Sequence, residues 1–254
     1  MTTVGSHSFA SLEDVTLVAV TGVAIGPTVD ALHASMRQAS FAQVLLLSDQ
    51  PPPPDADPAI QWRRIEPLRS RNDYSRFMLR SLADEIDTGH VLCVQWDGFI
   101  LDGKAWDPAF LEFDYVGAPW PHFHDNHNVG NGGFSLRSKR LLEACRDLPI
   151  GGAEAEDVVI SRLCRPLLER RGIRFAPEAV ARSFSYERSP PTGREFGFHG
   201  SFNLVRQLAR DEAVRLFRRL EPQMLARNER LELLRWALIH ARWKLALTML
   251  ARLA

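Results

Sequence analysis

The stretch Val91–Gly98, which reads VLCVQWDG, constrains the fold more than any other part of the chain. Its four apolar residues run directly into Gln95-Trp96-Asp97, and Gly98 then allows the backbone to turn. A short, continuous apolar run between turn signals is typical of a strand that is buried on both faces of an α/β sheet. Asp97 would stand at the carboxyl end of that strand, where open α/β sheets bind their ligands. From this stretch alone, it is equally consistent that Asp97 only makes a turn.

The segments that precede this stretch alternate between predicted strands and predicted helices. The strands are expected at Val15–Val20, Val44–Leu47 and Gln61–Ile65. A first helix starts at Pro27 or Thr28, and Asn72 or Asp73 can cap a second one; both carry apolar residues at helical spacing. This order predicts an α/β fold with a mixed, mostly parallel sheet, right-handed crossovers and flanking helices.

The segments that follow are less regular. Phe134–Arg137 alternates as a strand does, and Ser138 can cap the helix after it. Residues 158–171 have helical spacing, and Phe175–Tyr186 is predicted to contain a further strand.

Residues 204–254 form a separate, basic region. From Ser201 onward there are 11 Lys/Arg and 5 Asp/Glu, although the formal charge of the whole chain is zero. We therefore expect a folded domain over residues 1–203 and a helical extension over residues 204–254. Two interpretations of Arg230–Ala254 stay open. It can lie on an anionic membrane surface, or it can pack on the domain or in a dimer.

Composition excludes several classes of protein. The acidic body argues against a nucleic-acid-binding core. Neither a GxGxxG fingerprint nor a GxxxxGK[ST] phosphate loop occurs, and no apolar stretch is long enough to span a bilayer. Cys93, Cys145 and Cys164 are odd in number and lie in apolar patterns, so structural disulfides are not expected. Met1–Leu12 lacks the features of a signal peptide, and we expect a cytoplasmic protein.

Four separated groups of polar residues could meet at the carboxyl edge of the predicted sheet. They are Gln95-Trp96-Asp97, Asn131-Gly132-Gly133, Glu156-Asp157 and His199. Each group also has a purely structural explanation. The glycines can make a turn, the acids can complement the start of a helix, and the histidine can be a loop residue. Their joint occurrence favours a functional site.

The same residues carry a resemblance to a known family. The acidic triplet at a strand end, YVGAPW, GNGGFSLRS, a downstream ED and a late FGFHG together resemble a glycosyltransferase-like domain family of unknown function, built on the GT-A fold. The resemblance covers the chain from Val15 to Asn203, so it implies a GT-A-like domain over residues 1–203.

The resemblance implies roles for individual residues. Asp97 matches the last acid of the DxD motif that holds a divalent metal against the donor diphosphate, and His199 matches the late histidine that completes the coordination. Gln95 stands where the family has the first acid.

The remaining matches concern the base and the donor. Asp157, with Glu156 beside it, matches the general base of inverting members. The donor would be bound by further residues: Thr21, Asp49, Tyr74, Gln95, Asp97, Asn131, Gly132 and Gly133.

The expected function is transfer of a sugar from a UDP- or GDP-sugar to a glycan, lipid-linked or protein acceptor, with inversion and with Mn²⁺ or Mg²⁺ as cofactor. No nucleic-acid partner is expected. The C-terminal helices would either contact the inner face of the membrane peripherally or form a dimer. Two alternatives stay open: a nucleotidyl- or phosphotransferase that uses the same sheet edge, and a non-catalytic module that binds nucleotides or sugars.

Overall fold

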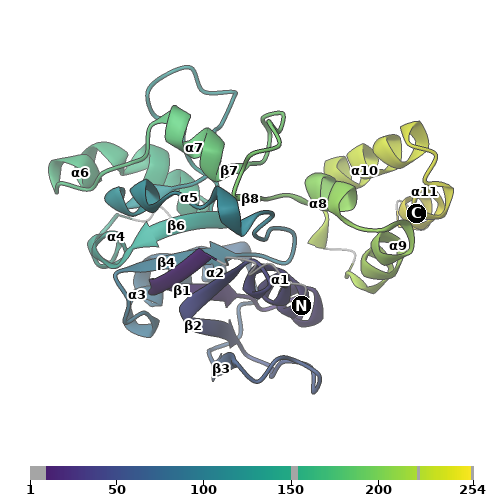
Figure 1. The fold of residues 1–254 in the computed structure, drawn as a ribbon, viewed down its shortest axis with the longest axis horizontal. Coiled ribbons are helices and arrows are strands. Elements are labelled where there is room, and N and C mark those ends of the chain that lie inside the picture. Colours follow the sequence, from purple (N-terminus) through teal and green to yellow (C-terminus); the bar gives the residue numbers. More distant parts are fainter. Residues whose placement is uncertain (1–9, 150–153, 222–223, 253–254) are drawn as a thin grey trace, which may run out of the picture.

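A computed structural model describes residues 10–149, 154–221 and 224–252. Six strands form one sheet in the order β3-β2-β1-β4-β6-β5 (Figure 1). They are β1 (Ala10–Val20), β2 (Ala39–Ser48), β3 (Ile60–Arg64), β4 (His90–Val94), β5 (Tyr115–Val116) and β6 (Phe134–Ser138). The pairs among β1 to β4 are parallel, whereas β6 is antiparallel to β4 and β5. The predicted fold class, a mixed and mostly parallel α/β sheet flanked by helices, is confirmed.

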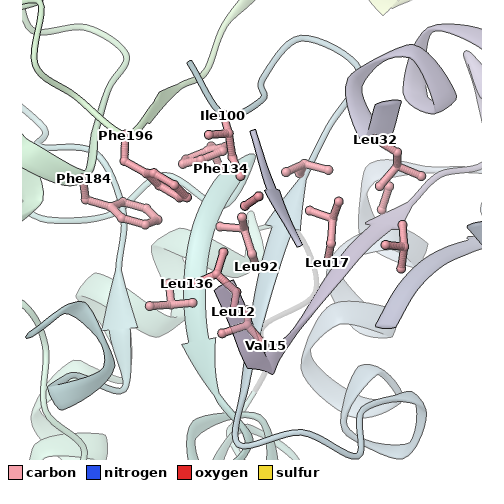
Figure 2. Close-up of a cluster of buried hydrophobic side chains, with 14 of the residues drawn as sticks. Leu12, Val15, Leu17, Leu32, Leu92, Ile100, Phe134, Leu136, Phe184 and Phe196 are labelled. Atoms are coloured by element: carbon pink, nitrogen blue, oxygen red, sulfur yellow. The ribbon is translucent and has the colours of Figure 1, made fainter. Parts of the chain in front are cut away.

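The central strands are buried on both faces. In β1, Leu17 and Ala19 point into one hydrophobic cluster, while Val18 and Val20 point into a second cluster on the other face. The first cluster includes Leu32 of helix α1 and a group of aromatic rings (Figure 2). This explains the continuous apolar runs in the sequence, because successive side chains of a strand point to opposite faces.

The direction of β6 decides where the site lies. Val94, the last residue of β4, pairs with Phe134, the first residue of β6, and His90 pairs with Ser138. Because β6 is antiparallel, the segment that enters it meets the same edge of the sheet as the carboxyl ends of β1 and β4. Asn131–Gly133 and Gln95–Asp97 are thereby brought together.

A long loop connects β5 to β6 at this same edge. It begins as a ladder, in which Trp120 N–H donates to the Asn128 carbonyl over 2.7 Å. The tip, residues 121–127, docks on another part of the chain: the Arg162 guanidinium lies 3.8 Å from the centre of the Phe123 ring and Nη1 donates to Asp125 over 2.6 Å.

Four helices or helical turns cover the sheet: α1 (Ile25–Met36), α2 (Arg71–Arg80), α3 (Leu82–Glu85) and α4 (Lys139–Cys145). Two short 3₁₀ turns, η1 (Gly103–Ala105) and η2 (Pro108–Glu112), follow β4. Ser138 caps α4 as predicted, since its hydroxyl accepts a bond from Leu141 N–H. The predicted cap of α2 is wrong. Ser70 caps this helix by accepting a bond from Asp73 N–H, and the Asp73 carboxylate accepts one from Arg69 N–H.

Two predictions for the middle of the chain need correction. The helix expected over residues 158–171 is broken into α5 (Glu156–Val158), the π-helix η3 (Val159–Leu163) and α6 (Arg165–Arg170). Pro166 cannot donate a helical hydrogen bond, so a continuous α-helix is interrupted there. Most of Phe175–Tyr186 is the helix α7 (Glu178–Phe184), which starts after Pro177; only β7 (Ser185–Tyr186) is a strand, paired with β8 (Gly197–Phe198).

The C-terminal part is a helical cluster with its own hydrophobic core, set to one side of the sheet (Figure 1). It contains α8 (Ser201–Gln207), α9 (Arg210–Arg219), α10 (Arg227–Ile239) and α11 (Trp243–Ala251). One side of α10 and α11 packs in this core through residues such as Leu233 and Met249. The described ranges contain no helix long and apolar enough to cross a membrane. The division at residues 203 and 204 stays a prediction.

All three cysteines are free and buried. This agrees with the sequence, from which no structural disulfides are expected. Residues 1–9, which carry most of the expectation about a signal peptide, lie outside the described residues.

Candidate functional site

A cavity of about 540 Å³ opens at the carboxyl ends of β1 and β4. Nine of the residues singled out in the sequence line it: Thr21, Tyr74, Gln95, Asp97, Gly132, Gly133, Glu156, Asp157 and His199. Asn131 lies behind the wall, where its side chain contacts His199. Asp49 is not among the lining residues, although it follows β2 at the same edge. The structure thus brings together all but one of the residues proposed for the site.

His199 is the centre of a polar cluster. Its Nε2 lies 3.2 Å from Asp97 Oδ1 and 3.3 Å from Gln95 Oε1. On the other side of the ring, Nδ1 lies 3.2 Å from the Asn131 amide and 3.6 Å from Glu187 Oε1. Burial would lower the pKa of His199, but Asp97 and Glu187 outweigh burial and hold that pKa well above its usual value. The two carboxylates on either side of the ring therefore both favour its protonated form.

Gln95 is oriented by a neighbouring tyrosine. Its amide Nε2 donates to the Tyr74 hydroxyl over 2.9 Å, which turns the carbonyl Oε1 toward His199. Burial raises the pKa of Tyr74 well above its usual value, so this hydroxyl stays protonated. The glutamine that replaces the expected acid therefore still offers an oxygen to the cluster.

The donor atoms of this cluster fit a divalent cation only in part. Asp97 Oδ1 is buried and accepts no hydrogen bond, and it faces His199 Nε2. Together with Gln95 Oε1, these atoms form a set of two oxygens and one imidazole nitrogen, which suits Mn²⁺ or Mg²⁺ if substrate and water supply the other ligands. No group of three or more His, Cys, Asp or Glu side chains in the described part of the chain could hold a metal ion.

The loop before β6 is packed so closely that only glycine fits at two positions. Asn131 has a φ of 68°, and its side-chain oxygen accepts bonds from the N–H groups of Gly133 and Phe134. A Cβ on Gly133 would lie 2.1 Å from His199 Nε2, and one on Gly132 would lie 2.1 Å from a carboxylate oxygen. The glycines of this loop are therefore required by contact and not by turn geometry, since only Asn131 has positive φ.

The two acids at the start of α5 have different surroundings. Glu156 is buried, and its Oε1 accepts a bond of 3.1 Å from Arg137 Nη2. Burial raises the pKa of Glu156 and Asp157 raises it further, while Arg137 opposes both. Asp157 is half-buried and accepts bonds from the N–H groups of Gly132 and Val158, over 2.9 and 2.8 Å. Of the two, Asp157 is the carboxylate that has no side-chain partner among the described residues.

Comparison with known proteins identifies the family. A family model described as "Protein of unknown function (DUF5672)" matches residues 59–199, which is more than half of the chain. The chain belongs to this family. No curated protein matches it.

Two solved structures of the glycosyltransferase LgtC are similar in fold. One is an active-site mutant of LgtC, with a TM-score of 0.46 and 13% identity. The other is the galactosyltransferase LgtC in complex with donor and acceptor sugar analogues, with a TM-score of 0.42 and 11% identity. Each match covers 72% of this chain and 86% of the other chain.

The DUF5672 segment also contains site residues that sequence reasoning missed. Arg69 and Arg71 flank the cap of α2 and line the cavity, on exposed positions. Arg137 is fully buried beneath the Gly132 loop, and Glu187 faces His199. Arg69 and Arg71 could have been noticed as a basic pair at a helix start. The other two carry no signal, because Arg137 occupies an ordinary position in an alternating strand and Glu187 lies in a polar loop.

Proposed function

We propose that this protein is a glycosyltransferase that moves a sugar from a nucleoside diphosphate sugar, with a UDP- or GDP-sugar as donor, to an acceptor hydroxyl. The observation that carries the proposal is the composition of the cavity at the carboxyl ends of β1 and β4. Cation ligands, exposed arginines and a free carboxylate line the same space of about 540 Å³. A reaction that separates a diphosphate from a sugar requires groups of these three kinds.

Asp97, His199 and Gln95 would hold a divalent cation, which supplies positive charge to the departing diphosphate when it is bound. Asp97 favours a proton on His199, so cation binding at the same atoms would compete with that proton. Arg69 and Arg71 line the same cavity and would add positive charge for the diphosphate. The donor-binding roles of Thr21, Tyr74 and the Asn131–Gly133 loop belong to the same proposal.

Asp157 would act as the general base. As the acceptor oxygen bonds to the anomeric carbon, the bond from that carbon to the diphosphate oxygen breaks, and the acceptor proton passes to the Asp157 carboxylate. This single displacement inverts the anomeric centre. The N–H groups of Gly132 and Val158 fix the carboxylate in place. Glu156 suits this role less well, because Arg137 occupies its side chain.

The first experiment is a thermal-shift panel of UDP- and GDP-sugars, each with and without Mn²⁺. We expect at least one donor to stabilise the protein, and Mn²⁺ to increase the shift. No stabilisation by any nucleotide would refute the proposal. The second experiment is the variant Asp157→Asn. It should reduce turnover by about 10²-fold or more and leave donor binding intact. Glu156→Gln is its matched comparison, and full activity of Asp157→Asn would exclude Asp157 as the base.

One observation favours a second candidate, a non-catalytic nucleotide- or sugar-binding module. The cation ligands include only two of the usual charged or imidazole side chains, because Gln95 replaces an acid. Such a module would bind a nucleotide-sugar without Mn²⁺ and would show no turnover with any acceptor. The panel above tests the dependence on Mn²⁺, and an assay of turnover with the stabilising donor separates the two candidates.

A further inference from the structure

The outer face of α11 is apolar although it is exposed. Trp243, Leu247 and Leu250 are 62%, 66% and 49% exposed, and their spacing of four and three residues puts them on one side of the helix. The opposite side, with Leu245 and Met249, is buried in the C-terminal core. The exposed side chains are therefore not needed to hold α11 in place.

The end of α10 extends this surface. Leu238 and Ile239 are 45% and 69% exposed, and only the turn of residues 240–242 separates them from Trp243. We call Leu238, Ile239, Trp243, Leu247 and Leu250 the apolar face. Large apolar side chains that are exposed on two packed helices favour a site of interaction.

The helices that carry the apolar face are rich in positive charge. Residues 227–252 contain six Arg or Lys and two Glu. Leu247 lines a shallow hollow together with Arg218, Lys244 and Arg252. Lys244 lies 3.5 Å from Asp211, an exposed pair that a competing anion can replace. Apolar side chains with a tryptophan and with Arg and Lys nearby are typical of helices that lie on membranes with anionic lipids.

The apolar face lies at the far end of a helix that starts at the candidate site. Glu229 of α10 lines the cavity, and Ile239 ends the same helix. Ten residues of α-helix span roughly 15 Å. Figure 1 shows that α10 and α11 lie to one side of the sheet, in the part of the molecule that projects farthest from it.

We propose that the apolar face binds the surface of a membrane that contains anionic lipids. Trp243, Leu247 and their apolar neighbours would enter the interface, and the exposed Arg218 and Lys244 would contact lipid phosphates. The proposal is independent of the proposed function, because it uses no residue of the cavity. A second copy of the chain is the alternative occupant.

The test is flotation of the full chain with vesicles of phosphatidylcholine alone and of phosphatidylcholine with phosphatidylserine. We expect binding to the anionic vesicles, much weaker binding to the neutral ones, and loss at high salt. The double variant Trp243→Ser/Leu247→Ser should reduce the bound fraction about tenfold or more. Trp62→Ser, at an exposed tryptophan of β3, is the matched control and should bind like the unchanged chain.

Thermal unfolding of the double variant should be close to that of the unchanged chain, since both side chains are exposed. Three results would overturn the proposal. They are absence of binding to the anionic vesicles, unchanged binding of the double variant, and a lipid-independent dimer that the double variant dissociates.

Discussion

Replacing Arg137 by methionine tests the buried ion pair beneath the Gly132 loop. The Arg137 side chain has no solvent exposure, and that of Glu156 is 6% exposed. Arg137 also donates to Ser135 Oγ over 3.0 Å and to the Gly132 carbonyl over 3.3 Å. Methionine fills much of the volume and removes all three bonds. Removing one partner of a buried ion pair costs about 3–5 kcal/mol, because the other charge is left without compensation.

The cost should depend on pH in a definite direction. Burial and Asp157 already raise the pKa of Glu156, and without Arg137 the carboxyl would bind a proton still more readily. The folded variant then binds more protons than its unfolded chain, so its stability falls as pH rises above the ordinary glutamate pKa of about 4.3. We expect a loss of about 3 kcal/mol or more near pH 8, and a smaller loss near pH 5.

Urea unfolding followed by tryptophan fluorescence at both pH values measures these losses. A loss of about 3 kcal/mol corresponds to a decrease of roughly 6–12 °C in the melting temperature. Glu156→Gln is the matched comparison: it leaves Arg137 charged and buried, and its cost should not shrink at low pH. Stability of Arg137→Met within about 1 kcal/mol of the unchanged chain at both pH values, or a loss that grows as pH falls, would refute the reasoning.

Three further variants have expected outcomes. Gly133→Ala should displace the His199 ring, because the new Cβ would lie 2.1 Å from Nε2; it should weaken Mn²⁺-dependent stabilisation by nucleotide while secondary structure measured by circular dichroism is unchanged. Ser138→Ala removes the cap of α4 and a bond of 2.5 Å to Asp114, so urea unfolding should show a loss of about 2–4 kcal/mol; a loss below about 0.5 kcal/mol would contradict this. Glu187→Gln should lower the pKa of His199, measured by NMR titration of its ring, and an unchanged pKa would show that Glu187 does not act on it.

Much of the sheet could be predicted because its central strands are buried on both faces. The apolar runs Val15–Val20, Val44–Leu47 and Val91–Val94 lie within β1, β2 and β4. The early start of β1 at Ala10 has no such signal, since this part of the strand alternates apolar and polar residues. The antiparallel direction of β6 could not be predicted either, because strand direction depends on the partner across the ladder and not on local pattern.

Site residues could be predicted where they follow a strand end or lie in a glycine run. They could not be predicted where their place in the site depends on a contact with a residue far away in the sequence. Gln95, Asp97 and Gly133 were found in this way, and they meet in the cavity. Asp49 shares the strand-end pattern and lies outside the lining, because the pattern fixes the edge of the sheet and not the position along it. Glu187 belongs to the site only because the fold places it against His199, and the sequence alone does not indicate that contact.

The loop between β5 and β6 has a consequence for how the family can diversify. Its ladder, with Trp120 bonded to Asn128, separates the tip from the sheet, so insertions in residues 121–127 would leave strand register unchanged. The tip nevertheless contacts Arg162 in the π-helix directly after α5. A change in tip length would therefore affect that helix and the Asp157 carboxylate just before it, whereas Gln95 and Asp97 follow β4 in another part of the cavity wall. Changes in the length of this loop could therefore alter the position of Asp157 among members of the family.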